Sequence, residues 1–164
     1  MKFLLYDVLE IGSYSNLPRF SEAPQDVIDA VLDSGSRFAS EVLQPINAIG
    51  DKQGCKRNPD GSVTTPTGFK EAYKQMSDDG WMAISADPEF GGQGLPRVVA
   101  MPFLEMCSSA NMAFSMYPGL TRGAAEAIQT GGSDEQKKTY LPNMVSGKWA
   151  GTMNLTEPQC GTDL

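Results

Sequence analysis

The chain has 164 residues, a net charge of −7 and 40% hydrophobic residues, which together predict one compact domain with a real core. Lysine and arginine do not cluster along the sequence, so no nucleic acid is expected as a partner. The sequence contains no histidine, which excludes Ser-His or Cys-His nucleophilic catalysis and histidine-ligated metals within this chain.

The three cysteines, Cys55, Cys107 and Cys160, are far apart and odd in number. Their spacing argues against a disulfide framework and against a zinc site, so no metal site is expected. Reduced thiols fit a cytoplasmic location best. No apolar run approaches the roughly 20 residues of a membrane-spanning helix, and residues 1–11 lack the pattern of a signal peptide.

The first part of the chain predicts a long helix followed by a loop. Residues 1–11 predict a short strand or a helical turn. A helix is predicted over residues 24–46, where apolar residues recur at helical spacing, with a bend or an end at Pro45. The polar stretch 50–66 predicts a loop or small hairpin, with a turn at residues 58–61.

The middle of the chain predicts two more helices separated by a loop. The second helix is expected to run from the cap Thr65 to Gly80. Residues 87–96 contain too much glycine and proline to be helical. A third helix is expected over residues 97–107, with Pro102 as an anomaly inside it.

The region after residue 110 predicts a further helical pair. Residues 111–118 read as apolar and partly helical, and a fourth helix is expected over residues 120–129. A fifth helix is expected to open with a capping box at residues 133–136 and to end at Pro142.

The end of the chain changes character. Residues 149–155 alternate in the manner of a β-strand. A lone strand is not stable by itself, so the chain is expected to end where a sheet begins. This pattern favours a piece of a longer protein.

Two internal motifs have a functional reading and an ordinary one. The glycine-rich residues 90–94 have the composition of a phosphate-binding loop, but no strand precedes them with the right spacing, and a plain turn is favoured. Glu105 and Glu126 lie near apolar residues, where burial can tune a base, but a solvated or paired carboxylate is favoured. No catalytic residue is assigned to this chain.

The last residues offer hydrogen-bonding groups after the expected strand. Pro158 breaks the strand and Gly161 allows a tight turn. The hydroxyls of Thr156 and Thr162 are then placed to hydrogen-bond a planar polar ligand. An ordinary turn at a strand end is the favoured alternative from chemistry alone.

The same residues carry a family resemblance. Residues 155–164, LTEPQCGTDL, closely resemble the flavin-site signature of the acyl-CoA dehydrogenases. Residues 80–81, 90–96 and 134–142 resemble further segments of that family in the right order. The resemblance covers nearly the whole chain and points to the branch that includes 3-methylmercaptopropionyl-CoA dehydrogenases.

The resemblance implies a fold and a domain division. The fold class is mostly α: the N-terminal helical domain of an acyl-CoA dehydrogenase, with the first strand of a missing β-domain at its C-terminal end. Residues 1–20 are then an N-terminal extension, residues 21–147 the helical domain, and residues 148–164 the truncated start of the middle β-domain.

The resemblance also implies an activity. Family members are FAD-dependent oxidoreductases that convert an acyl-CoA thioester to the trans-2-enoyl-CoA and pass electrons to electron-transferring flavoprotein. Their catalytic glutamate belongs to a third domain, so this chain alone is expected to be inactive. A homo-oligomer is expected when the protein is full length.

Site residues follow from the matched signature. Met153, Leu155 and Thr156 match positions that touch the flavin, and Thr156 is expected at the pyrimidine edge of the ring. Thr162 matches a position that contacts the flavin or the CoA moiety. Residues 116–120 are expected at the acyl end of the substrate pocket. The alternative is a short non-catalytic helical module that binds an acyl chain or a protein partner through exposed apolar faces.

Overall fold

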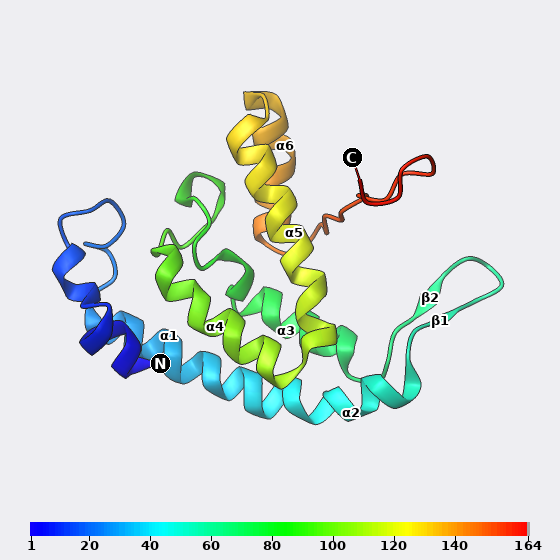
Figure 1. The fold of residues 1–164 in the computed structure, drawn as a ribbon, viewed down its shortest axis with the longest axis horizontal. Coiled ribbons are helices and arrows are strands. Elements are labelled where there is room, and N and C mark those ends of the chain that lie inside the picture. The colour runs from blue at the N-terminus through cyan, green and yellow to red at the C-terminus, as the bar shows by residue number, and fades with distance from the viewer. Residues whose placement is uncertain (164) are drawn as a thin grey trace.

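The computed structural model describes residues 1–163, and it is mostly helical, which confirms the predicted fold class (Figure 1). The longer helices are α1 (Gln25–Arg37), α2 (Gln44–Gln53), α3 (Phe69–Asp78), α4 (Arg97–Ala110), α5 (Met112–Gly131) and α6 (Asp134–Val145). Shorter helical turns are η1 (Leu4–Val8), η2 (Ile11–Tyr14), η3 (Phe38–Leu43), η4 (Trp81–Ala83) and η5 (Pro88–Phe90). A small antiparallel hairpin consists of β1 (Lys56–Arg57) and β2 (Val63–Thr64).

A long helical rod of α1, η3 and α2 runs along the lower edge of the molecule in Figure 1. The sequence predicted a helix over residues 24–46 that bends or ends at Pro45, but the rod continues to Gln53. The π-helical turn η3 precedes the proline, and its hydrogen bond joins the Gln44 N–H to the Ala39 carbonyl. This wider turn makes room for a proline ring that would clash in a regular α-helix.

The hairpin after α2 confirms the predicted turn. Its Asn58 N–H donates to the Ser62 carbonyl at 2.8 Å, and Gly61 has a φ of +84°. The start of the second predicted helix was wrong, because α3 begins after Gly68 and not at Thr65. Gly68 has a φ of +89°, a left-handed conformation that glycine adopts without strain. The predicted end at Gly80 is confirmed by the cap geometry of α3.

Two of the helices continue past a proline further than the sequence predicted. α5 continues through the buried Pro118, so the partly helical residues 111–118 and the helix expected over residues 120–129 form one helix. α6 opens with the predicted capping box, but it runs three residues past Pro142 because Met144 and Val145 are buried there. The loop at residues 87–96 also contains one 3₁₀ turn, η5, which Asp87 caps by accepting a hydrogen bond from the Glu89 N–H.

Asn111 joins α4, α5 and the rod. Its side-chain oxygen accepts from the Phe114 N–H at 3.0 Å and caps α5, and its amide nitrogen donates to the Leu43 carbonyl at 3.3 Å. This side chain is buried, so both of its polar ends are satisfied where water is absent. The residue fixes where α5 leaves the core.

The main core lies between the rod and α4. Its most deeply buried side chains, each 1% exposed or less, include Leu43, Val99, Phe103 and Cys107. Trp81 stacks on Phe103 with ring centroids 4.3 Å apart. Full burial of one large apolar side chain stabilises the fold by about 1.5–3 kcal/mol. A smaller core of Ala83, Phe90, Leu141 and Val145 packs the loop after α3 against α6.

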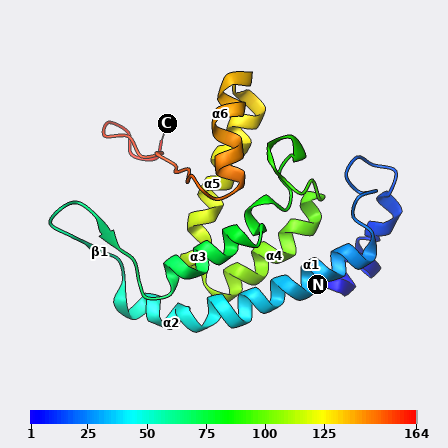
Figure 2. The same cartoon turned by 180° about the vertical axis from the view of Figure 1, so that it is seen from behind.

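The N-terminal segment is helical and packs on α1, at the end of the rod opposite the hairpin (Figures 1 and 2). Leu5 and Ile11 are buried in the main core. The Tyr6 hydroxyl donates to an Asp29 oxygen at 2.8 Å, and Lys2 forms ion pairs with Asp29 and Asp33 at 3.3 Å. Several contacts therefore hold this segment against α1.

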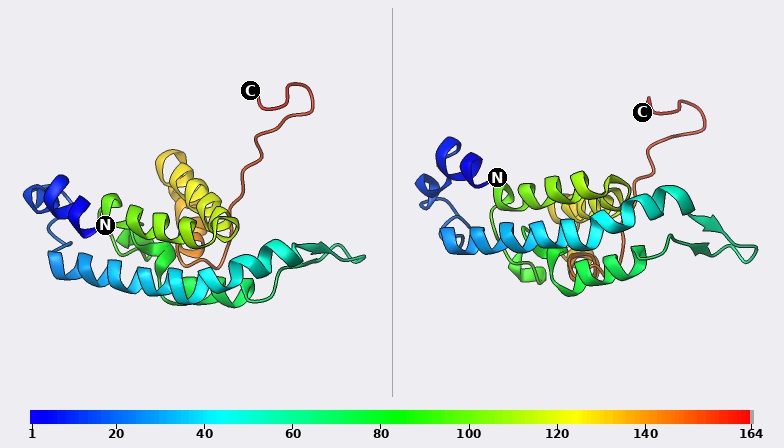
Figure 3. Two further views of the ribbon diagram at one scale, coloured as in Figure 1. Left: turned by 60° about the horizontal axis from the view of Figure 1, so that its bottom comes forward. Right: turned by 90° about the horizontal axis from the view of Figure 1, so that it is seen from below.

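The chain leaves the helical body after Gly151 (Figure 3). Tyr73 donates to the Gly147 carbonyl at 3.0 Å, and the Gly151 N–H donates to the Thr121 hydroxyl at 3.2 Å. Beyond that point residues 152–156 carry no secondary structure, so the strand expected over residues 149–155 is not formed in the described chain. A strand needs a partner, and the described residues place none beside it.

Among the helices of residues 1–163, none has the length and apolar character needed to cross a bilayer.

Candidate functional site

The predicted flavin-contacting residues lie on the C-terminal segment. Met153, Leu155, Thr156 and Thr162 are all exposed there, with Met153 exposed at 63%. The segment projects away from the helices in Figures 1 and 3. None of these four residues lines the pocket between α5 and α6 described below. Their role as cofactor contacts stays a prediction.

The predicted turn in this segment does form. Glu157 and Gly161 exchange two backbone hydrogen bonds, of 2.8 and 2.9 Å, and Gly161 has a φ of +64°. Thr156 and Thr162 flank this turn with exposed side chains. Within the described chain, residues 152–156 take part in no backbone–backbone hydrogen bond, so their amide groups are available to a ligand or to a neighbouring strand.

The stretch expected at the acyl end of a substrate pocket lies on α5. Met116 is 61% exposed and Tyr117 51% exposed, and the Tyr117 ring packs edge-on against Tyr73 with centroids 5.3 Å apart. Among residues 1–163, apart from its chain neighbours and the backbone of its own helix, no atom lies within 4 Å of the position that a Cβ on Gly119 would take. This face of α5 is apolar and open.

The glycine-rich loop at residues 90–94 is an ordinary turn. Each backbone N–H from Gly91 to Leu95 donates to a carbonyl of the same loop region, at 2.8–3.1 Å. Phosphate-binding loops need free N–H groups, and here these groups are already used. Gly92 is also packed so closely that an added Cβ would lie 2.0 Å from the Ala86 carbonyl oxygen.

The two carboxylates considered as bases have structural surroundings. Glu105 is exposed, and Glu126 forms an ion pair with Arg97. Neither observation favours a tuned catalytic base, which agrees with the interpretation from sequence.

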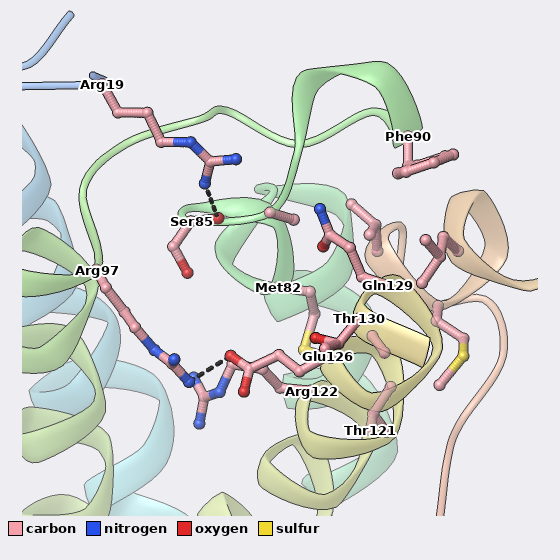
Figure 4. A pocket seen from close by; sticks show the side chains of 15 residues that line it. Arg19, Met82, Ser85, Phe90, Arg97, Thr121, Arg122, Glu126, Gln129 and Thr130 are labelled. Carbon is pink, nitrogen blue, oxygen red and sulfur yellow. Dashed lines mark hydrogen bonds and ion pairs between the residues drawn. The ribbon is translucent and has the colours of Figure 1, made fainter. Parts of the chain in front are cut away.

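A pocket of about 270 Å³ lies between α5, α6 and the loop that follows α3 (Figure 4). Arg97 and Arg122 extend toward one another beside Glu126, and Arg19 reaches over the loop. The apolar side of the pocket includes Met82, Ala86, Phe90, Ala125, Leu141, Met144 and Val145.

Two of the pocket arginines have acidic partners. Arg19 donates to the Ser85 carbonyl and to Asp87, both at 3.2 Å, and Arg97 pairs with Glu126. Arg122 is half-buried, and its pKa is lowered mainly by burial; Glu126 opposes this shift and Arg97 adds to it. The guanidinium stays charged at neutral pH, because an arginine pKa starts far above 7.

Sequence reasoning missed this pocket. Its arginines come from three separate segments, and none of them belongs to a motif with recognisable spacing. A weak signal was available: Arg122 and Glu126 are four residues apart on the apolar helix α5, which places both charges on one face.

The fold and sequence together show the family. The sequence profile described as "Acyl-CoA dehydrogenase, N-terminal domain" matches residues 26–148. The chain belongs to the acyl-CoA dehydrogenase family. The matched range spans all the longer helices, α1 to α6, apart from the first residue of α1.

Two dehydrogenases are similar to this chain in sequence. The 3-methylmercaptopropionyl-CoA dehydrogenase of Ruegeria pomeroyi is 45% identical over 148 residues, which cover 90% of this chain and 25% of that protein. A butyryl-CoA dehydrogenase of Syntrophomonas wolfei is 40% identical over 85% of this chain and 23% of its own length. The resemblance to the 3-methylmercaptopropionyl-CoA dehydrogenase branch is thereby confirmed, and the chain spans about a quarter of these acyl-CoA dehydrogenases.

A solved structure has the same helical arrangement. Butyryl-CoA dehydrogenase from Megasphaera elsdenii superposes with a TM-score of 0.70 at 22% identity, over 85% of this chain and 34% of that one. At this identity the likeness concerns the fold, which is that of acyl-CoA dehydrogenases.

Proposed function

We propose that the chain is the N-terminal portion of an FAD-dependent enzyme that oxidises an acyl-CoA thioester to the trans-2-enoyl-CoA. The observation that carries this proposal is the 45% identity to a 3-methylmercaptopropionyl-CoA dehydrogenase over 90% of the chain. In a reaction of this class a base would remove the α-proton, and FAD, when bound, would supply the acceptor for the hydride that leaves the β-carbon.

We propose that the C-terminal segment of this chain, residues 152–162, forms one edge of the FAD site. The hydroxyls of Thr156 and Thr162 are exposed, and the amide groups of residues 152–156 are not used in backbone pairing within the described chain. Such groups fit the polar rim of a flavin ring, with Met153 and Leu155 against its apolar face. FAD supplies the hydride acceptor when it is bound.

The proposed contribution to the substrate site is the open face of α5. Met116 and Tyr117 are apolar and exposed, which suits the end of an acyl chain. We further propose electron-transferring flavoprotein as the electron acceptor, a homo-oligomer of the longer protein, and a cytoplasmic location.

The 164-residue chain alone is expected to lack dehydrogenase activity. Its candidate carboxylates are exposed at Glu105 and ion-paired at Glu126, and it has no histidine. The test compares this chain with the longer reading frame in a dye-reduction assay with butyryl-CoA and 3-methylmercaptopropionyl-CoA. We expect FAD-dependent turnover from the longer protein and none from the 164 residues.

Two results would contradict the proposal. Turnover by the 164-residue chain would show that the base lies within it. A longer protein that binds FAD but oxidises neither thioester would remove the assigned reaction.

A non-catalytic binding module is the second candidate. The observation that favours it is the exposure of large apolar side chains on α5, where Met112 and Met116 are 59% and 61% exposed. A monodisperse 164-residue chain that binds acyl-CoA without FAD in calorimetry would support this function. Aggregation of the isolated chain would favour the enzyme fragment.

A further inference from the structure

The pocket in Figure 4 has more positively charged arginines than carboxylates around it. Three arginines, Arg19, Arg97 and Arg122, line it with one carboxylate, Glu126. Asp87 does not line the pocket but pairs with Arg19, so these five groups together have a net charge of +1. Arg19 and Arg97 each have an ion-pair partner. Arg122 makes no hydrogen bond or ion pair with any residue in the described range 1–163.

The position of Arg122 makes its charge energetically unfavourable. The residue is half-buried beneath the loop after α3, and removal of an unpaired charge from water is unfavourable. The Arg97 guanidinium extends toward it, and two like charges repel. An oxyanion between the two guanidiniums removes both costs, because it accepts hydrogen bonds from each.

A second donor nearby also lacks an acceptor. The Trp81 indole N–H is buried and has no hydrogen-bond partner in residues 1–163. Trp81, Ser85 and Arg122 line a small cavity of about 10 Å³, and Ser85 and Arg122 line the larger pocket as well. A cavity of this size holds at most one water molecule, so it extends the polar side of the pocket only slightly.

The opposite side of the pocket is apolar and small. Leu141 and Val145 of α6 and Phe90 of the loop belong to the smaller core, and they form this side. A volume of about 270 Å³ lies just below the range of pockets that hold drug-sized ligands. The shape therefore suits a short apolar chain with one charged end.

We propose that this pocket binds a small organic carboxylate with a short aliphatic chain. Its oxygens accept from Arg122 and Arg97, and its aliphatic part lies against Leu141 and Val145. A single negative charge matches the net charge of +1, whereas a phosphate dianion would leave the pocket negative. The site is separate from residues 153–162, and the proposal does not rest on the dehydrogenase function.

The test uses butyrate as the probe and the folded 164-residue chain, with folding checked by circular dichroism. NMR or calorimetric titration is expected to give a Kd on the order of a millimolar, as suits so small a ligand. Butyramide, which has the same shape without the charge, is expected to bind at least about ten-fold more weakly, since one charge-assisted hydrogen bond is worth roughly that factor.

Substitutions at the pocket test whether butyrate binds there. Arg122→Gln is expected to weaken butyrate binding at least about ten-fold, the same factor as loss of the ligand charge. Arg57→Gln, which changes an exposed arginine in the hairpin, should leave it unchanged. If Arg122→Gln does not fold, Ala125→Leu serves instead, because the larger side chain fills part of the pocket and should also weaken butyrate binding.

Four results would overturn the proposal: no butyrate binding to the folded chain, equal binding of butyramide, equal binding of inorganic phosphate, or unchanged affinity in the folded Arg122→Gln or Ala125→Leu variant.

Discussion

Gly92 shows how closely the loop after α3 packs on itself. An added Cβ would lie 2.0 Å from the Ala86 carbonyl oxygen, which is backbone and cannot rotate away. Gly92→Ala is therefore expected to lower the free energy of unfolding by about 1–3 kcal/mol, the usual range for overpacking. Urea denaturation followed by circular dichroism measures the change.

Gly123 is the matched control at the same scale. It lies within α5, and no atom approaches its ideal Cβ position within 4 Å. Gly123→Ala is expected to raise the free energy of unfolding by about 0.5–1 kcal/mol, because alanine favours a helix more than glycine does. Equal stabilities of the two variants would show that the close approach at Gly92 is not real.

The N-terminal segment adds a pH-dependent contact at the scale of elements. Burial, together with the hydrogen bond to Asp29, raises the pKa of Tyr6 to about 12, from an ordinary value of 10. The unfolded chain therefore loses this proton first, and the free energy of unfolding falls as the pH rises from about 10 to about 12. Below pH 10 the stabilisation is complete.

Tyr6→Phe is expected to reduce this alkaline slope. Some slope remains, because burial also raises the pKa values of Tyr73 and Cys107. The measurement is the difference in urea midpoint between wild type and variant at several pH values from 8 to 12. Tyr14→Phe, in the same segment, changes a more exposed ring and is the control. Parallel curves for wild type and Tyr6→Phe would refute the contact.

Unfolding of the whole domain can be measured by the reactivity of one buried thiol, Cys107. Cys107 is 1% exposed in the core between the rod and α4, and burial raises its pKa to about 12. Cys55 and Cys160 are exposed. At pH 8 a thiol reagent is expected to label Cys55 and Cys160 quickly and Cys107 only as the domain opens.

The labelling rate of Cys107 should rise with urea in step with the loss of helix. The variant pair Cys55→Ser and Cys160→Ser isolates this signal. Rapid labelling of all three thiols without denaturant would contradict this prediction. It would mean either that the core opens readily or that Cys107 is not buried.

Local sequence signals predicted local structure well. The capping box at Ser133 and the turn at residues 58–61 depend on neighbouring residues, and both are confirmed. The cap at Thr65 failed because the left-handed Gly68 starts α3 instead. The fourth helix was expected to begin at residue 120, but α5 begins at Met112 and passes through Pro118, where tertiary burial outweighs one lost helix hydrogen bond.

Features that depend on contacts between residues far apart in the sequence could not be predicted from local signals. The expected strand at residues 149–155 requires a neighbouring strand, and pairing cannot be read from one segment. The pocket requires Arg19, Arg97 and Arg122 from separate segments. The four flavin-contacting residues were identified through the family signature, and they stay predictions.

Arg19 links the N-terminal segment to the loop after α3. The family profile begins at residue 26, so the arginine that bonds Ser85 and Asp87 at the pocket rim lies before the range that the profile matches. One wall of the pocket is therefore formed by helices within the profile, α5 and α6, and the rim by a residue that precedes its range. A chain cut back to the range of the profile would therefore keep α5 and α6 but lose the rim contacts of Arg19 with Ser85 and Asp87.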